Sequence, residues 1–157
     1  PKGHGAKALL AKIVGSNEGF DLVVFMVDAD GTSKADWRAK RTEINSGFAE
    51  EKGIAARGVA CVPKTTSESW LLSDPGAWRQ CGLKDLRSLP AHPEDRWGRR
   101  NDPGGKHPHQ EFARLCRSAA ISDSAETRVR VAEATSIATL KRKCPVSFGA
   151  FQSDLLS

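Results

Sequence analysis

Three kinds of feature are missing from this sequence, and each absence excludes a class of protein. No apolar run approaches the roughly 20 residues that a membrane-spanning helix needs, and no signal-peptide core is visible, so no membrane anchor is predicted. The four cysteines form no CxxC pair, which argues against a zinc ribbon or a disulfide framework and for reduced, buried thiols in a cytoplasmic protein. There is no internal repeat and no low-complexity segment, so a repeat architecture is not expected.

The composition that remains is typical of one globular domain. The chain of 157 residues is 39% hydrophobic and 27% charged, and it is long enough to bury a core. Its net charge of +5 is compatible with a nucleic-acid partner but does not require one. Because the sequence begins in the middle of a pattern at Pro1, we expect a short N-terminal segment with a first strand to precede it.

In the first half, apolar patterning predicts helices that alternate with strands. The continuous apolar run at residues 22–27 favours a strand that is buried on both faces, as in a parallel sheet. Ser33 or Thr32 can cap the second helix, in which Trp37, Ile44 and Phe48 are expected to face inward. The first helix is expected at residues 6–14, where Gly15 and Ser16 end it, and the second helix at residues 35–51. The strands are expected at residues 22–27 and 59–62.

The second half is predicted to be helical apart from one long polar loop. Ser67 or Thr66, Asp74 and Asp123 are the expected N-terminal caps of three of its helices. The loop, at about residues 82–105, contains prolines, glycines and several arginines and is expected to have no regular structure. The expected helical segments are 68–72, 75–81, 106–118, 123–134, 137–143 and a last amphipathic helix from Pro145. The fold class predicted is therefore α/β, with a small, mostly parallel sheet flanked by helices and a helical C-terminal part.

The motif DADGT, at the end of the first predicted strand, is the strongest chemical signal in the sequence. Asp28 and Asp30 fall on the same side of an extended chain, at the edge where open α/β sheets bind ligands. Taken alone, the motif leaves three interpretations open. The pair can bind a divalent cation, Asp28 can be the nucleophile of a haloacid-dehalogenase-type phosphatase, or the aspartates can form a turn that caps the next helix.

The rest of the chain favours the metal site over the phosphatase. The second half supplies no apolar strand ending in paired acidic residues, which the phosphatase family needs. Glu68 follows the second predicted strand, and it would lie at the same sheet edge as Asp28 and Asp30 if the two strands are parallel neighbours. It could then complete a cation site or transfer a proton. The alternative is a glutamate that only stabilises the start of a helix.

Three stretches together resemble a TOPRIM-like bacterial family of unknown function that is related to the OLD/TOPRIM nuclease superfamily. They are VDADG, the run ESWLLSDPGAW that follows the strand ending in proline, and the C-terminal run containing CPVSF. The resemblance covers nearly the whole chain and implies a compact TOPRIM-like, Rossmann-like fold. It also implies that Asp28 and Asp30 bind Mg²⁺ or Mn²⁺. The glutamate that ends the first strand in that superfamily is not in this sequence, and Glu68 would have to replace it.

A basic cluster in and after the long loop is the candidate nucleic-acid surface. Arg99, Arg100, Lys106 and His107 are expected to contact phosphates, and an exposed Trp97 could stack on an unpaired base. The alternative is a mobile, solvated loop.

These observations lead to one main hypothesis and two alternatives. The main one is a Mg²⁺-dependent nuclease in which Asp28 and Glu68 are the catalytic residues, acting on DNA or RNA. The resemblance adds an SMC- or OLD-like AAA ATPase encoded nearby and a role in anti-phage defence. The lack of long apolar runs predicts no membrane partner, and a homodimer is left open. The second is a non-catalytic subunit that binds a partner or a nucleic acid, and the third is the phosphatase.

Overall fold

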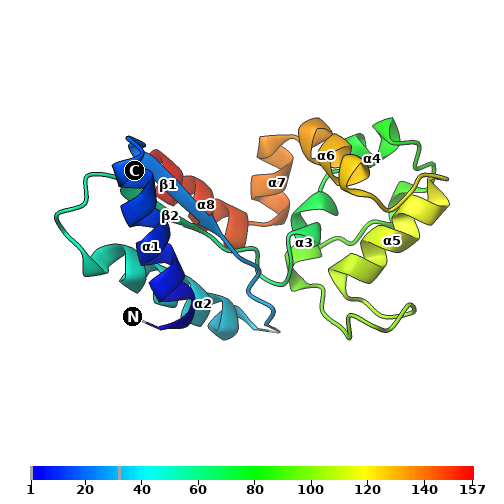
Figure 1. Cartoon of the computed structure of the whole chain (residues 1–157). Helices are drawn as coiled ribbons and strands as arrows, with labels where there is room; N and C mark the ends of the chain where they lie inside the picture. The colour runs from blue at the N-terminus through cyan, green and yellow to red at the C-terminus, as the bar shows by residue number, and fades with distance from the viewer. Residues whose placement is uncertain (1, 32) are drawn as a thin grey trace.

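Two lobes make up the computed structural model, which describes residues 2–31 and 33–157 (Figure 1). The sheet lobe contains both strands with α1, α2 and α8, and the helical lobe contains α3 to α7 (Figure 1). The chain therefore crosses from the sheet lobe to the helical lobe after β2 and returns with α8. The helices and strands are α1 (Gly3–Asn17), β1 (Leu22–Met26), α2 (Lys34–Glu50), β2 (Arg57–Cys61), α3 (Glu68–Leu71), α4 (Pro75–Gln80), α5 (Pro108–Ser118), α6 (Ala125–Ala134), α7 (Ile137–Lys143) and α8 (Ser147–Leu156).

The sheet consists of β1 and β2, which pair in parallel as predicted, with Leu22 opposite Arg57 and Met26 opposite Cys61. Backbone pairing continues past both strands, because the amide of Asp30 still donates to the carbonyl of Thr65 at 3.0 Å. The segments that follow the two strands therefore run side by side as far as the predicted site. This confirms the α/β class at the level of a small parallel sheet flanked by helices.

The prediction that β1 is buried on both faces is wrong. Leu22, Val24 and Met26 are 38%, 45% and 53% exposed, whereas Val23 and Phe25 are partly buried. The reason lies in the packing of the helices. Helix α1 packs against β1, whereas α8 packs against β2 (Figure 1). The face of β1 that carries Leu22, Val24 and Met26 therefore stays open. A two-stranded sheet with one covering helix on that side cannot bury both of its strands.

Helix α2 forms as its sequence predicts. The hydroxyl of Ser33 accepts the amide of Asp36 at 3.1 Å, and the Asp36 carboxylate accepts the Ser33 amide at 3.0 Å, which makes a complete capping box. Trp37, Ile44 and Phe48 are all buried, as expected. Thr32, the alternative cap, lies outside the described residues.

Several predicted boundaries need correction. Helix α1 runs from Gly3 to Asn17, through the Gly15 and Ser16 that were expected to end it, because α1 packs against α2 and β1 with Gly15 buried, and tertiary contacts override the low helix propensity of glycine. Strand β2 begins at Arg57 and ends at Cys61, so that Val62 lies beyond it. Helix α6 is capped by Ser124, whose hydroxyl accepts the amide of Thr127 at 3.2 Å, and not by Asp123.

The first turns of α3 and α5 also differ from the prediction. Ser67 precedes α3, but no side-chain hydrogen bond caps this helix, and the Ser67 amide donates to Asp28 instead. Helix α5 begins at Pro108 instead of Lys106, since His107 provides its cap by accepting the amide of His109 at 3.2 Å. Proline at the first helical position needs no hydrogen-bond partner for a backbone N–H.

The long polar loop is more ordered than its composition predicts. It contains two 3-10 turns, Leu86–Ser88 and Pro93–Asp95. The carboxylate of Glu94 is buried and accepts three bonds from the start of α8, from the Val146 amide at 2.9 Å, the Ser147 amide at 3.0 Å and the Ser147 hydroxyl at 2.8 Å. A buried carboxylate that caps a helix in this way joins the loop of one lobe to the last helix of the other.

Each lobe has its own core. In the helical lobe, Trp78, Phe112, Leu72 and Val131 have no exposed surface and form one cluster with Cys81 and Cys116, among others. In the sheet lobe, Ile44, Trp37 and Phe48 pack with Ala8 and the residues of β2.

All four cysteines are free and buried, and burial raises the pKa of the Cys116 thiol to about 11. No helix within residues 2–31 and 33–157 is both long and apolar enough to cross a membrane.

Candidate functional site

Asp28 and Asp30 lie at the carboxyl edge of the sheet, where the sequence predicts them. Asp28 is half-buried, and its Oδ1 accepts the backbone amide of Ser67 at 2.8 Å. Asp30 is exposed and has a positive φ of 52°, a conformation that aspartate adopts more readily than most residues other than glycine. This backbone turns the chain away from the sheet directly before α2.

Asp28 is the more strongly perturbed of the two carboxyl groups. Burial is the main reason that its pKa rises to about 6, although the bond from Ser67 opposes the rise. The negative charges of Glu68 and Asp30 raise the pKa further, and the positive charge of Arg100 lowers it. Asp28 is therefore under electrostatic influence from both carboxylates and from one arginine of the long loop, which places all four groups in one neighbourhood.

Glu68 lies at the start of α3, beyond the end of β2, as predicted, but its carboxylate is already paired. It lies 3.3 Å from the Nδ1 of His109 and 3.6 Å from a guanidinium nitrogen of Arg128. Burial would raise the pKa of Glu68, but hydrogen bonds, among them those from Thr66 and His109, and the Arg128 charge outweigh this effect and lower it. Glu68 is therefore a charged group that holds α5 and α6 against the start of α3.

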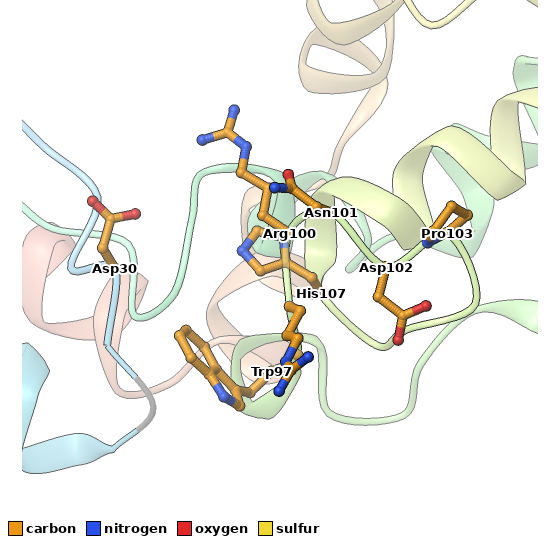
Figure 2. Close-up of a pocket in the computed structure, with 9 residues that line it drawn as sticks. Asp30, Trp97, Arg100, Asn101, Asp102, Pro103 and His107 are labelled. Carbon is orange, nitrogen blue, oxygen red and sulfur yellow. The ribbon is translucent and has the colours of Figure 1, made fainter.

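A cleft of about 920 Å³ separates Asp30 from the long loop. Its loop side is formed by residues 97–103 and by His107. Figure 2 shows Asp30 on its own segment of chain, facing the side on which Trp97, His107 and Arg100 lie, whereas Asp102 points away from it. An acidic group from the sheet lobe and basic groups from the loop therefore line one cleft.

The loop side of the cleft is held in place by contacts that the sequence did not indicate. The guanidinium of Arg96 makes a bidentate ion pair with Glu111 of α5, with Nε 3.0 Å from both carboxylate oxygens. Hydrogen bonding to Glu111 raises the pKa of Arg96 above its ordinary value. Arg114 donates to the carbonyls of Pro103 at 2.9 Å and Gly105 at 2.7 Å. These pairs join residues 9 to 15 positions apart in the chain, and no periodic pattern in the sequence marks them.

The four residues that were predicted to contact nucleic acid differ in their exposure and in whether they line the cleft. Arg99 and Arg100 are exposed and line the cleft. Lys106 is exposed but is not part of the cleft lining. His107 lines the cleft but is only 5% exposed, and burial, with the nearby Arg100 and His109 charges, lowers its pKa. His107 is thus a neutral helix cap, and the cationic part of this surface is the pair of arginines.

The chemistry of the two aspartates fits a hard divalent cation. Carboxylate oxygens are the ligands that Mg²⁺ and Mn²⁺ prefer, and a cation would offset the negative neighbours that raise the pKa of Asp28. Within residues 2–31 and 33–157, however, no three His, Cys, Asp or Glu side chains are arranged as a metal-binding group. Asp28 and Asp30 are therefore the candidate ligands, and a third position at Glu68 stays a prediction.

No protein-family model, no curated protein and no solved structure matches this chain. The resemblance to the TOPRIM-like family therefore stays a prediction from the three sequence stretches that carry it.

Proposed function

We propose that this chain is a Mg²⁺-dependent, TOPRIM-like nuclease that acts on the phosphodiesters of nucleic acids. One observation carries the proposal. Asp30 shares a cleft with Arg99 and Arg100, directly beside the half-buried Asp28. A cleft that combines cation-binding carboxylates with arginines suits a phosphate-containing chain, because the arginines bind phosphates and the carboxylates hold a cation between themselves and another phosphate.

The roles of the residues follow from their surroundings. Asp28 and Asp30 would hold the cation at the end of β1, which keeps them at the sheet edge through the backbone pairing of Asp30 with Thr65. When bound, Mg²⁺ or Mn²⁺ would stabilise the negative charge that develops on the phosphate during cleavage. Arg99 and Arg100 would bind the phosphates on either side of the cleaved bond.

Glu68 has a supporting role in this proposal. Because the charge of Glu68 acts on the Asp28 carboxyl group, we assign to Glu68 a part in the proton transfer that cleavage requires. Burial opposes the ionised form of Glu68, but hydrogen bonds, among them the contact with His109 at 3.3 Å, and the Arg128 charge outweigh it. His109, which does not line the cleft, holds the Glu68 carboxylate in place.

The first experiment measures metal-dependent cleavage of single-stranded DNA, duplex DNA and RNA by the purified protein. Asp28→Ala should abolish cleavage in Mg²⁺ or Mn²⁺, with the fold retained by circular dichroism. Asp21→Ala is the matched control, since Asp21 is an exposed aspartate at the opposite end of β1, and it should cleave like the wild type. Cleavage by Asp28→Ala at the wild-type rate would contradict the proposal.

A non-catalytic subunit is the second candidate, because the Glu68 carboxylate is already paired with His109 and Arg128 instead of being free to bind a cation. In that case the cleft binds nucleic acid or a partner without cutting it. Calorimetric titration with Mg²⁺ and Mn²⁺ distinguishes the two candidates. Metal binding that is lost in Asp28→Ala favours the nuclease, whereas nucleic-acid binding without any metal binding favours the non-catalytic subunit.

The same proposal includes a partner. On the family resemblance, an SMC- or OLD-like AAA ATPase encoded nearby would work with this chain in anti-phage defence. Co-purification of the chain with the product of such a neighbouring gene is the direct test.

A further inference from the structure

Trp97 differs from the other three tryptophans in its surroundings. The indole N–H groups of Trp37, Trp70 and Trp78 donate at 2.7 to 2.8 Å to Val62, Ser147 and Leu71, and Trp37 and Trp78 are buried. Trp97 is 42% exposed, and its indole N–H has no hydrogen-bond partner within the described part of the chain. Its ring is therefore available to a ligand, whereas the other three serve the cores and the contacts between helices.

Trp97 also stands where two cavities meet. It lines the cleft that contains Arg99 and Arg100, and it lines a second cavity of about 500 Å³ along α2 that contains Lys40. Asp30 and Trp97 are the residues that the two cavities share. A chain that passes over the indole ring would thus meet arginines on one side, whereas the second cavity holds Lys40 together with Asp36 and Glu43 and is mainly acidic.

The residue directly before Trp97 is anchored to two other segments, which limits where the Trp97 ring can lie. The carbonyl of Arg96 accepts the hydroxyl of Thr65 at 3.0 Å, which links it to the segment after β2. The Arg96 side chain is held by Glu111 of α5. The rings of Trp97 and His107 lie 6.2 Å apart at an angle of 54°. A ring that is already ordered loses little conformational entropy when a base stacks on it.

From this arrangement we infer that the cleft takes a single-stranded nucleic acid, with one unpaired base stacked on Trp97. The phosphates next to that base contact Arg99 and Arg100, on the side away from the acidic cavity along α2. A duplex does not fit this mode, because its bases are stacked on each other and their faces are not accessible to the indole ring. The inference rests on the proposed function, since it uses the same cleft, and it narrows the substrate to unpaired strands.

The test measures binding of a fluorescent single-stranded oligothymidine and of a blunt-ended duplex made of two complementary strands by anisotropy, once in EDTA and once in Ca²⁺. The wild type should bind the single strand at least tenfold more tightly than the duplex. Because the variant removes the aromatic face on which the base stacks, Trp97→Leu should weaken single-strand binding by about tenfold and leave duplex binding unchanged. Trp97→Phe, which keeps an aromatic face, should retain most of the affinity.

Two further variants serve as controls. Arg100→Ala should weaken the binding of both nucleic acids, and Arg117→Ala, at an exposed arginine near the end of α5, should change neither. Equal binding of single strand and duplex, or an unchanged affinity in Trp97→Leu, would overturn the inference but leave Asp28-dependent cleavage, and hence the proposed function, intact. If neither nucleic acid binds in either buffer, both are wrong.

Discussion

The two lobes differ in how completely they bury their apolar residues. The helical lobe encloses Trp78 and Phe112, whose ring centroids lie 5.2 Å apart in an edge-to-face arrangement without exposed surface. The sheet lobe buries Ile44 completely, yet it leaves Val24 and Met26 of its first strand about half exposed. The core of the helical lobe therefore closes around its two rings, although Val129 and Ile137 at its surface are 54% and 56% exposed, whereas the first strand of the sheet lobe has one open face.

This difference matches what each lobe contributes to the candidate site. The helical lobe positions the loop, because Arg96 and Arg114 both attach residues of the loop to α5. The sheet lobe presents Asp28 and Asp30 at the end of a strand that is supported by only one neighbour. The cleft therefore combines a loop that is anchored to α5 with a strand end that has only one neighbouring strand.

The largest effect is expected in the core of the helical lobe. Trp78→Ala should lower the free energy of unfolding by about 3–5 kcal/mol, because it removes a fully buried ring and its hydrogen bond to the Leu71 carbonyl at 2.7 Å. Urea denaturation followed by circular dichroism measures the change. Trp97→Leu is the control, and because this ring is partly exposed in the cleft, it should cost less than about 1 kcal/mol. Similar losses in both variants would contradict the picture of a closed helical core.

A smaller effect is expected where α1 meets α2 in the sheet lobe. A Cβ at Gly47 would lie 2.0 Å from the backbone carbonyl oxygen of Gly5, so the two helices must move apart in Gly47→Ala. Overpacking of this kind costs about 1–3 kcal/mol, and the gain in helix propensity offsets part of it. We expect a net loss of about 1–2 kcal/mol in the free energy of unfolding.

The matched control for this change is Gly53→Ala. A Cβ at Gly53 has no heavy atom within 4 Å, so this variant should unfold like the wild type to within about 0.5 kcal/mol. A larger loss in Gly53→Ala than in Gly47→Ala would show that the close approach of α1 and α2 does not limit the stability of the sheet lobe.

The smallest effect is expected on the pH dependence of the free energy of unfolding, through the carboxyl group of Asp28. Because its pKa in the folded protein, about 6, lies above the ordinary value of 3.8, the folded state binds the proton more tightly than the unfolded chain. The stability associated with this proton is present at low pH and is lost as the pH rises from about 4 to about 6. Asp28→Asn stays neutral and keeps an oxygen for the Ser67 amide, so in metal-free buffer at pH 7 it should be more stable than the wild type.

The expected gain at pH 7 is only about 1 kcal/mol, because solvent screens a half-buried group. Urea denaturation at pH 4 and pH 7 measures it, and the two proteins should differ less at pH 4. Asp21→Asn, at an exposed carboxylate, should follow the pH dependence of the wild type. If Asp28→Asn loses the same stability as the wild type between pH 4 and pH 7, Asp28 is not the group responsible.

Local patterns predicted the elements of the sheet lobe well because short-range rules control them. The apolar run before Asp28 indicated a strand, and the spacing of Trp37, Ile44 and Phe48 indicated the buried face of α2, which is confirmed. The cap at Ser33 is also local, since its hydroxyl binds an amide three residues away. Local patterns could not predict the open face of β1, because it depends on where α8 returns to the sheet.

The structure of the long loop, in contrast, could not be predicted from local patterns. Its prolines, glycines and charges indicated a segment without regular structure, and the structure instead contains two 3-10 turns and a buried Glu94 that caps α8 from 52 residues away. Such a contact leaves no trace in the periodicity of either segment. Trp97 stands in the same loop, and only the folded chain shows that it lines the same cleft as Asp30.

The amino-acid sequence by itself determined where the strands and most helices form, that they pair in parallel, and that Asp28, Asp30 and Glu68 stand beyond the ends of the two strands. These features follow from side-chain periodicity, caps and turn residues, which act over a few positions. Only the tertiary structure decided that Glu68 is paired with His109 and Arg128, that His107 is buried, and that Arg99, Arg100 and Trp97 line one cleft with Asp30. The pairs of Glu68 join helices that are far apart in the chain but belong to the same lobe. The cleft forms only because the long loop of the helical lobe lies opposite Asp30 of the sheet lobe.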